Sequence, residues 1–390
     1  MYEELKPPSR LLMGPGPSNV HPRVLKAMAT PLVGHLDPYF LEVLERTSDL
    51  LRMVFDTKNE FTIAISGTGS AGMEACLCSI TEPGDEIIVG VKGTFGERMV
   101  DIVRRLGGKP IIVEQEPGKI IEPDQIKRAL DENKAKAVAI VHAETSTGVL
   151  QPLDGIGDMV RKHGALFIVD TVTSLGGAPV NVDERKIDIC YSGTQKCLNC
   201  PPGLSPLTIS ERAWTIIEER KTPITSWYLD VTMLKRYWGK ERWYHHTAPV
   251  SMIYALYEAL RIIEEEGLES RFEKHKVTGE AVRESMKALG LDLFAQEGYE
   301  TPMLTSVKIP DGIDDRTFRK TLLTKHNLEI AGGLDVLKGK IWRIGHMGYG
   351  TQPAFVLPTL TAIEKTLRDL GRDIEPGTAA SAALQVLEKL

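Results

Sequence analysis

The chain has 390 residues, of which 42% are hydrophobic, enough to build a large core and two domains. Its 47 basic and 53 acidic side chains give a formal net charge of −6 at pH 7, which argues against nucleic acid as the main partner. No run of about 18 apolar residues occurs, so we expect no transmembrane helix and no membrane partner.

Residues 1–20 predict an irregular arm, because Gly14–Asn19 is a turn-rich segment that fits neither a helix nor a central strand. The chain starts without the apolar segment of a secretory signal, so we expect a cytoplasmic protein. Helical periodicity begins at Val24–Met28 and continues in Leu41–Phe55.

A glycine-rich turn, Gly67–Gly72, follows the first clear strand signal, Phe61–Ser66, and precedes a helix predicted over Met73–Ile80. The free backbone amides and the helix dipole at such a junction favour a phosphate group. Thr68 and Ser70 add hydroxyl donors. We therefore expect an anion site here.

The same turn matches the G-x-G-x-x-G pattern of dinucleotide-binding proteins. A dinucleotide site needs an acidic residue at the end of the next strand. That strand, Glu86–Val91, is followed by Lys92 and Gly93, so the pattern is better explained as a simple phosphate turn. Phe95 lies just beyond, where its ring either packs in the core or stacks on a flat ligand.

Strand and helix signals then alternate along the chain. Apolar strands are predicted at 110–113, 137–141 and 166–170, and helices at 124–131 and 154–163. Near-continuous apolar strands that alternate with helices are typical of an α/β fold with a largely parallel sheet covered by helices.

Two side chains are predicted to stand at the carboxyl ends of strands in this sheet. Asp170 ends the apolar run Leu166–Asp170, and Lys196 follows the strand signal Ile187–Tyr191. Open α/β sheets bind ligands at this edge, and neighbouring strands lie about 4.8 Å apart. A lysine that forms a Schiff base and an aspartate that pairs with a pyridinium nitrogen are what pyridoxal 5′-phosphate (PLP) requires. The pair therefore predicts PLP chemistry.

The cysteines and histidines do not indicate a metal site. Five cysteines, an odd number in a long chain, do not suggest a disulfide framework. Cys197 and Cys200 have the spacing of half a zinc site, but no second pair follows. The adjacent His245 and His246 point in different directions in any regular element. We expect ordinary thiols and no metal.

After Gly203 the pattern predicts a strand at 207–209, a helix from Glu211 and long helices at 250–267 and 271–289. Between them, Ser226–Thr247 is rich in aromatic and basic residues, a mixture found in nucleic-acid sites and in protein interfaces. The acidic chain favours an interface loop.

Beyond residue 290, short strands at 304–309, 328–330 and 341–344 and helices from Asp315 and Pro358 predict a smaller α+β domain. Arg343 lies in the last strand, where it forms either a surface ion pair or a bidentate contact with a carboxylate. We expect an arm over 1–20, a large domain over 21–268 and a small domain over 269–390, with a short terminal helix after Gly377.

Together these residues resemble the class V branch of the PLP-dependent aminotransferases, which have fold type I, and within it the alanine–glyoxylate/serine–pyruvate group. The similarity extends from Leu11–Asn19 to Arg343–Gly345. Its strongest blocks are Ser146–Leu153, Val169–Asp170, Ser174–Gly177, Tyr191–Gly193, Gln195–Lys196, Pro201–Gly203 and Tyr244–Thr247.

The resemblance implies a role for each candidate residue. Lys196 and Asp170 would be catalytic: Lys196 would bond the cofactor and move the proton, and Asp170 would keep the ring nitrogen protonated. Arg343 would bind the substrate α-carboxylate. The remaining cofactor-binding residues would be Thr68, Gly69, Ser70 and Gln195 at the phosphate, Phe95, Thr145 and Val172 at the ring, and Tyr244 and Thr247 at the phosphate of the neighbouring subunit of a homodimer with shared active sites.

Some positions depart from the family pattern. Phe95 stands in place of a stacking tryptophan, and Ser70 stands in place of a histidine that could add a cationic donor. Cys197 and Cys200 replace alanines. We also expect no N-terminal targeting extension of the kind that some relatives have.

The implied reaction is a transamination in two halves, with alanine or serine as donor and glyoxylate or pyruvate as acceptor. Phosphoserine aminotransferase is an alternative, although no basic groups for a second phosphate are identifiable. Cysteine desulfurase needs a nucleophilic cysteine well after the lysine, and none follows Cys200. A non-catalytic binding protein would have no use for both Lys196 and Asp170.

Overall fold

The structure is a computed structural model that describes residues 2–388. Its centre is a seven-stranded sheet with the strand order β2-β10-β9-β8-β5-β3-β4. In this sheet β10 alone runs antiparallel to its neighbours, which confirms the expected α/β fold with a mostly parallel sheet. The strands are β2 (Phe61–Ser66), β10 (Leu204–Ile209), β9 (Ile189–Tyr191), β8 (Leu166–Asp170), β5 (Ala137–Val141), β3 (Glu86–Val91) and β4 (Lys109–Glu114).

The central strands form because their residues are apolar on both faces and stay buried on both faces. Every residue of β5 and β8 is buried. The register pairs Val141 of β5 with Asp170 of β8, and Asp170 with Tyr191 of β9. The carboxyl ends of these three strands therefore meet at one edge of the sheet, where Asp170 and the loop that follows Tyr191 lie next to each other.

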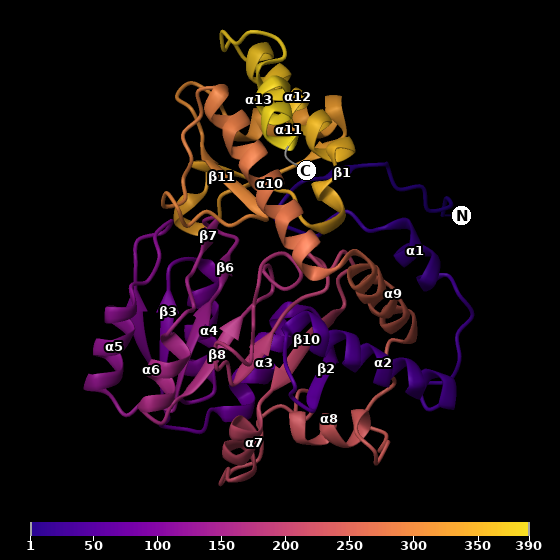
Figure 1. Ribbon diagram of the computed structural model, residues 1–390, viewed down its shortest axis with the longest axis vertical. Helices are drawn as coiled ribbons and strands as arrows, with labels where there is room; N and C mark the ends of the chain where they lie inside the picture. Colours follow the sequence, from indigo (N-terminus) through magenta and orange to yellow (C-terminus); the bar gives the residue numbers. More distant parts are fainter. Residues whose placement is uncertain (1, 389–390) are drawn as a thin grey trace.

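Helices surround this sheet (Figure 1). They are α1 (Pro22–Met28), α2 (Pro38–Phe55), α3 (Gly69–Ile80), α4 (Thr94–Arg105), α5 (Pro123–Glu132), α6 (Ile156–Lys162), α7 (Glu211–Glu218), α8 (Val231–Trp238) and α9 (Val250–Glu266). A small hairpin of β6 (Ala143–Glu144) and β7 (Val149–Leu150) follows β5. The segment expected to be an interface loop contains α8, whose buried face includes Leu234 and Tyr237.

Helix α3 begins earlier than the sequence pattern predicts, at Gly69 and not at Met73. The glycine-rich turn is therefore partly the first turn of the helix. Gly72 has no side chain because a Cβ there would lie 2.0 Å from the Ser205 hydroxyl oxygen of β10. Packing against the sheet thus overrides the low helix propensity of glycine.

The C-terminal elements gather at one end of the molecule, and α10 extends from them toward the large sheet (Figure 1). A three-stranded sheet has the order β11-β14-β13. These elements are α10 (Leu268–Ala288), β11 (Leu304–Lys308), α11 (Asp315–His326), β12 (Leu328–Glu329), β13 (Ala331–Gly332), η1 (Asp335–Leu337), β14 (Ile341–Gly345), η2 (Gly348–Thr351), α12 (Pro353–Asp369) and α13 (Thr378–Leu387).

Helix α12 begins at Pro353, earlier than the predicted start at Pro358. Proline suits the first position of a helix, where its missing N–H needs no partner. Pro358 instead lies inside α12, where the buried neighbours Val356, Leu360 and Ile363 hold the helix in place.

Two large hydrophobic cores are separate in sequence. One contains buried residues between Val24 and Ile263, and the other contains residues between Val277 and Val386. Met13 of the N-terminal arm belongs to the second core, and β1 (Leu11–Leu12) pairs in parallel with β12. The arm is thus not wholly irregular, because it adds a short strand to the C-terminal region. The domain limits at residues 20 and 268 stay predictions.

Over residues 2–388, none of the helices combines the length and the apolar character that crossing a membrane requires. All five cysteines are free and buried, as the sequence suggests. In the same part of the chain, no three His, Cys, Asp or Glu side chains form a group that could hold a metal ion.

Candidate active site

A cavity of about 210 Å³ lies at the carboxyl edge of the large sheet. Nine of the twelve predicted site residues line it: Thr68, Gly69, Ser70, Phe95, Thr145, Asp170, Val172, Gln195 and Lys196. The cavity is formed where β2, β3, β5, β8 and β9 end and their following loops converge. Residues that were predicted from separate stretches of the sequence therefore line the same cavity.

Lys196 lies on the loop that follows β9 and is buried, with 8% of its surface exposed. Its Nζ donates a hydrogen bond to the carbonyl oxygen of Pro15 in the N-terminal arm. Burial, followed by the nearby charge of Arg343, lowers the pKa of Lys196 to about 8. The amine is therefore neutral more often than an exposed lysine near pH 7, and only the neutral amine is a nucleophile.

Asp170 ends β8, and both of its carboxylate oxygens have partners. Oδ1 accepts a hydrogen bond from the Val172 backbone N–H at 2.8 Å, and Oδ2 accepts one from the Tyr191 hydroxyl at 2.8 Å. Burial raises the pKa of Asp170 to about 6. A cation such as a protonated pyridine nitrogen would oppose that rise and keep the carboxylate charged.

The N-terminus of α3 forms one end of the cavity. Thr68 is the N-cap residue, and its side chain makes no capping hydrogen bond, so its hydroxyl remains available. Gly69 must be small, because a Cβ there would lie 3.0 Å from a methyl group of Val172. The first amides of α3 and the helix dipole point to this end, as a phosphate requires.

Gln195 supplies a further polar group at the cavity. Its Oε1 is buried without a hydrogen-bond partner among the described residues. A buried, unpaired amide is costly, and its oxygen and nitrogen ends can be exchanged by a rotation of the side chain. The unpaired amide fits a site that is completed by a polar ligand.

Phe95 lies in the first turn of α4 and is half-buried at the cavity. The Arg98 guanidinium lies 4.9 Å from the centre of the Phe95 ring. The ring is thus in the site and not only in the core, as the stacking interpretation requires. Together with the amine of Lys196, the carboxylate of Asp170 and the anion site of α3, it makes a set that fits PLP.

Arg343 comes from β14 in the C-terminal region and reaches the edge of the cavity. Its Nη1 donates to the carbonyl oxygen of Thr145 at 3.0 Å, and its Nε donates to that of Gly332 at 2.8 Å. Burial lowers the pKa of Arg343 to about 10. Arg343 is not among the residues that line the 210 Å³ cavity, although its partner Thr145 is, and it lines another cavity of about 890 Å³. Arg343 is buried, and within residues 2–388 its hydrogen bonds are with carbonyl groups, so a surface ion pair is the wrong interpretation.

Tyr244 and Thr247 are not brought to this cavity. Their hydroxyl oxygens lie 3.2 Å apart, and 52% of the Tyr244 surface is exposed. In a single chain they are separate from the other predicted residues. Their contact with a neighbouring subunit stays a prediction.

Sequence reasoning missed several residues at the site. The cavity is also lined by Met73, Arg98, Val141, Ala143 and Thr173. Tyr191 was assigned no role beyond a strand end and a block of family resemblance, yet its hydroxyl donates a hydrogen bond to Asp170. The β8–β9 register that places Tyr191 opposite Asp170 has no signal in the sequence of either strand.

A second buried lysine lies close by. Lys92 follows β3, is 1% exposed and donates to the carbonyl oxygen of Val141. Burial lowers its pKa to about 8, as for Lys196. Lys92 is absent from the cavity lining, so the position of its amine, and not its pKa, distinguishes it from Lys196.

Comparisons with known proteins agree with this geometry. The family model "Aminotransferase class-V" matches residues 11–348. The (S)-ureidoglycine–glyoxylate transaminase of Bacillus subtilis is 43% identical over 99% of this chain and 97% of that protein. A crystal structure of the ureidoglycine–glyoxylate aminotransferase from B. subtilis has a TM-score of 0.97 at 44% identity, covering 99% of this chain and 100% of that one.

The crystal structure of an alanine–glyoxylate aminotransferase from Nostoc sp. is 46% identical, with a TM-score of 0.93 over 94% of this chain and 98% of that one. The resemblance stated from the sequence is confirmed. PLP is the cofactor of this family, and the residues of the cavity fit it. The chain belongs to the class V aminotransferases.

Proposed function

We propose that this enzyme moves the amino group of a small amino acid, alanine or serine, to glyoxylate or pyruvate. The observation that carries the proposal is that Lys196 and Asp170 are buried in one cavity with Arg343 at its edge. The similarity to the alanine–glyoxylate aminotransferase from Nostoc sp. supports this donor and acceptor.

Lys196 would hold the cofactor through a Schiff base, formed from its amine and the cofactor aldehyde with loss of water, and would move the substrate proton. Bound PLP supplies an electron sink, which allows an amino acid to lose its α-proton and exchange its nitrogen. The lowered pKa of Lys196 favours the neutral amine, the form that attacks a carbonyl carbon and accepts a proton. Asp170 is fixed by hydrogen bonds from Tyr191 and the Val172 amide, and its carboxylate would pair with the ring nitrogen.

The remaining cavity residues bind and orient the cofactor. The α3 N-terminus, with the Thr68 and Ser70 hydroxyls and the Gln195 amide, binds the phosphate. Phe95, Val172 and Thr145 line the cavity and would contact the ring, Thr145 near its 3′-oxygen. Each of these roles is assigned to a side chain or amide that already faces the cavity.

Arg343 binds the α-carboxylate of the substrate. Its contacts with the Thr145 and Gly332 carbonyl oxygens fix the plane of the guanidinium and use only two of its five donors. The other donors are left to pair with a carboxylate in a bidentate manner. A single arginine at this position suits monocarboxylic amino acids.

We further propose that the active enzyme is a homodimer in which Tyr244 and Thr247 reach the cofactor phosphate of the other subunit. Support comes from their exposure and from the exposed aromatic groups on the same segment, Trp227, Tyr228 and Trp243. Such side chains are enriched at interfaces and are rarely left exposed together.

Co-expression of two inactive variants tests the shared site. In a mixed dimer of Lys196→Ala and Tyr244→Ala subunits, one site carries both defects and the other carries neither. We expect activity to return to about one quarter of the wild-type value if half of the dimers are mixed. Each variant expressed alone is the control, and no gain over these controls would place Tyr244 in its own subunit's site.

Steady-state kinetics with a panel of donors tests the reaction itself. We expect the highest kcat/KM with alanine or serine and glyoxylate. (S)-Ureidoglycine is a second candidate donor, because the B. subtilis relative named for it covers nearly the whole chain. Phosphoserine serves as the contrasting donor, and a higher kcat/KM with phosphoserine than with any of the other donors would overturn the proposal.

We propose a cytoplasmic location, which the five free cysteines support, because disulfides are rare in reducing compartments. Cell fractionation with antibody detection would test it.

A further inference from the structure

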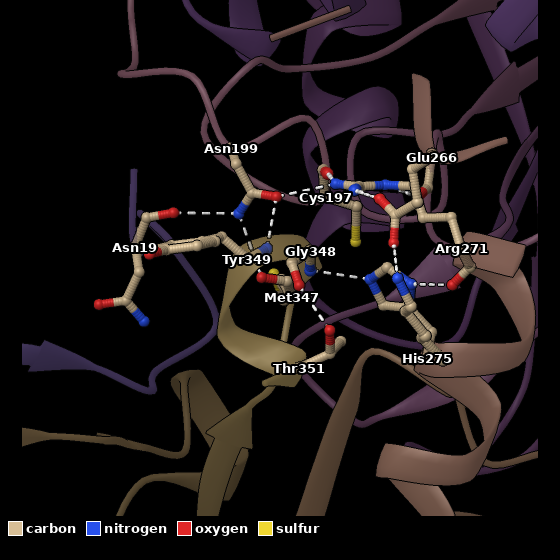
Figure 2. A network of polar contacts seen from close by, with 12 residues as sticks. Asn19, Cys197, Asn199, Glu266, Arg271, His275, Met347, Gly348, Tyr349 and Thr351 are labelled. Atoms are coloured by element: carbon tan, nitrogen blue, oxygen red, sulfur yellow. Dashed lines mark hydrogen bonds and ion pairs between the residues drawn. The ribbon is translucent and has the colours of Figure 1, made fainter. Parts of the chain in front are cut away.

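The loop that carries Lys196 is held by a buried polar network centred on Asn199 (Figure 2). Asn199 is 4% exposed and has a backbone φ of 53°, a left-handed conformation that asparagine tolerates better than most residues. Its backbone N–H donates to the Lys196 carbonyl oxygen at 3.0 Å, and the Ser18 hydroxyl donates to the same oxygen at 2.7 Å. The network therefore reaches the backbone of Lys196 directly.

Both ends of the Asn199 amide are fully used. Nδ2 faces the Ser18 hydroxyl oxygen at 3.1 Å and the carbonyl oxygens of Asn19 at 3.0 Å and Met347 at 3.1 Å. Oδ1 accepts from the Tyr349 N–H at 2.7 Å and from Arg271 Nη2 at 2.8 Å. These partners fix which end of the amide points where. One side chain thus joins the Lys196 loop, the N-terminal arm and the segment after β14.

Arg271, in the first turns of α10, extends the network to the other catalytic strand. It is 5% exposed, and its Nε donates to the carbonyl oxygen of Gly176 at 2.9 Å. Its Nη2 also donates to the carbonyl oxygen of Cys197, the residue after Lys196, and its Nη1 pairs with Glu266. Gly176 lies in the turn that follows Asp170, so Arg271 connects the turns after both catalytic residues.

His275 connects α10 to the segment that follows Arg343. Its Nε2 accepts from the Gly348 N–H at 2.8 Å, and its Nδ1 lies 2.8 Å from the Arg271 carbonyl oxygen, to which it can only donate. Burial lowers the pKa of His275 to about 3, so the ring stays neutral in this arrangement. Gly348 must be glycine, because its φ is 52° and a Cβ would lie 1.6 Å from Asn199 Oδ1.

We propose that Asn199, Arg271 and His275 are positioning residues that set the Lys196 loop relative to β14 and therefore to Arg343. The proposal rests on the roles given above to Lys196 and Arg343. Because the substrate nitrogen and carboxylate are attached to the same carbon atom, the groups that bind them must be placed together. A displacement of about 1 Å by a change remote from the chemistry can cost roughly 100-fold in rate.

The first test is Asn199→Asp in the PLP-loaded enzyme. The carboxylate keeps the shape but cannot donate, so it would repel the Asn19 and Met347 carbonyl oxygens. We expect kcat/KM for the amino donor to fall roughly 10- to 100-fold. We also expect faster hydrogen–deuterium exchange in residues 194–201 and 345–351 together, with no change in 86–91.

The matched control is Asn327→Asp. Asn327 has the same φ of 53° but lies exposed at the end of α11, where its Oδ1 accepts from Arg10. Because aspartate keeps that oxygen, we expect both kinetics and exchange to stay within about twofold of the wild type.

Arg271→Lys disrupts the same network at a second residue, because an ammonium group cannot make the forked contacts of the guanidinium. We expect the same paired rise in exchange and a similar fall in kcat/KM. If either folded variant had a lower Tm but unchanged kcat/KM, or if only one of the two segments exchanged faster, the positioning role would be wrong. The exchange measurement needs no turnover, so an inactive wild type would count against the proposed function and not against this network.

Discussion

The two sides of the cavity differ in how the chain builds them. The cofactor side consists of strand ends and turns of one sheet, so nine predicted residues arrive there through local structure. The proposed substrate side depends on Arg343, which comes from another sheet and is fixed by carbonyl oxygens of Thr145 and Gly332. The positions of the nine residues are thus set by the order of strands in one sheet, and the position of Arg343 by its contact with Thr145 across two sheets.

Lys196→Ala removes the amine on the cofactor side and has the largest expected effect. We expect transamination to fall by roughly 1,000-fold or more, because no other amine of residues 2–388 lines the cavity to move the proton. PLP should still bind without a covalent bond. The measurement is initial rate with alanine and glyoxylate, together with cofactor content, and the control is Lys134→Ala at an exposed lysine. Activity near the wild-type value would remove Lys196 from the mechanism.

Arg343→Ala removes the guanidinium on the substrate side and leaves the cofactor-side residues unchanged. We expect kcat/KM for the donor to fall roughly 10- to 100-fold, mainly through KM, as for the loss of a charge-assisted hydrogen-bond pair. Cofactor affinity should change little. Arg316→Ala is the matched control, since Arg316 is exposed on the 890 Å³ cavity that Arg343 also lines. An unchanged KM in Arg343→Ala would exclude the carboxylate contact.

The charge of Arg343 on the substrate side should affect how the rate of PLP capture, the bonding of PLP by Lys196, depends on pH. Burial and the charge of Arg343 lower the pKa of Lys196 from 10.5 to about 8, and only the neutral amine bonds PLP. In the cofactor-free protein, the rate of capture should therefore rise with pH and level off above about 8. In Arg343→Ala the midpoint should move to higher pH, because a positive neighbour is lost. Stopped-flow absorbance would measure both curves, and a midpoint that moved downward would contradict this electrostatic coupling.

Phe95→Trp changes only the stacking ring on the cofactor side, and it has the smallest expected effect. The family pattern places a tryptophan here, and a larger ring increases stacking by about 0.5–1.5 kcal/mol. We therefore expect PLP to bind two- to tenfold more tightly, on the order of that free energy. Equilibrium titration of the cofactor-free protein measures the change. Weaker binding would mean that Arg98, which stacks on Phe95, leaves no room for the larger ring.

The same difference between the two sides explains which features of the site could be predicted from the sequence. Thr68 and Lys196 lie in the turns after β2 and β9, and Asp170 ends β8. Alternating strand and helix signals were enough to place all three at one edge of the sheet. The Asp170–Tyr191 contact depends on strand register, and the Arg343–Thr145 contact depends on tertiary packing. Neither contact has a local sequence pattern, so the sequence predicted neither, although it indicated Arg343 itself as a candidate carboxylate ligand.

The contacts of Asn199 are a second feature that could not be predicted from the sequence. In the sequence it was one residue in a Pro-Pro-Gly-terminated loop, with no periodicity or motif to mark it. Its five side-chain contacts come from the N-terminal arm, α10 and the segment after β14, each more than 70 residues away in sequence. Long-range polar contacts of this kind become visible only when the fold brings the segments together.

The central claim is that PLP is bonded to Lys196. The most direct test is to reduce the purified, PLP-loaded protein with borohydride, digest it and locate the added group by tandem mass spectrometry. We predict a reduced pyridoxyl phosphate group on Lys196 alone. Modification of Lys92, the other buried lysine whose pKa is lowered to about 8, or no modification at any lysine, would contradict the account.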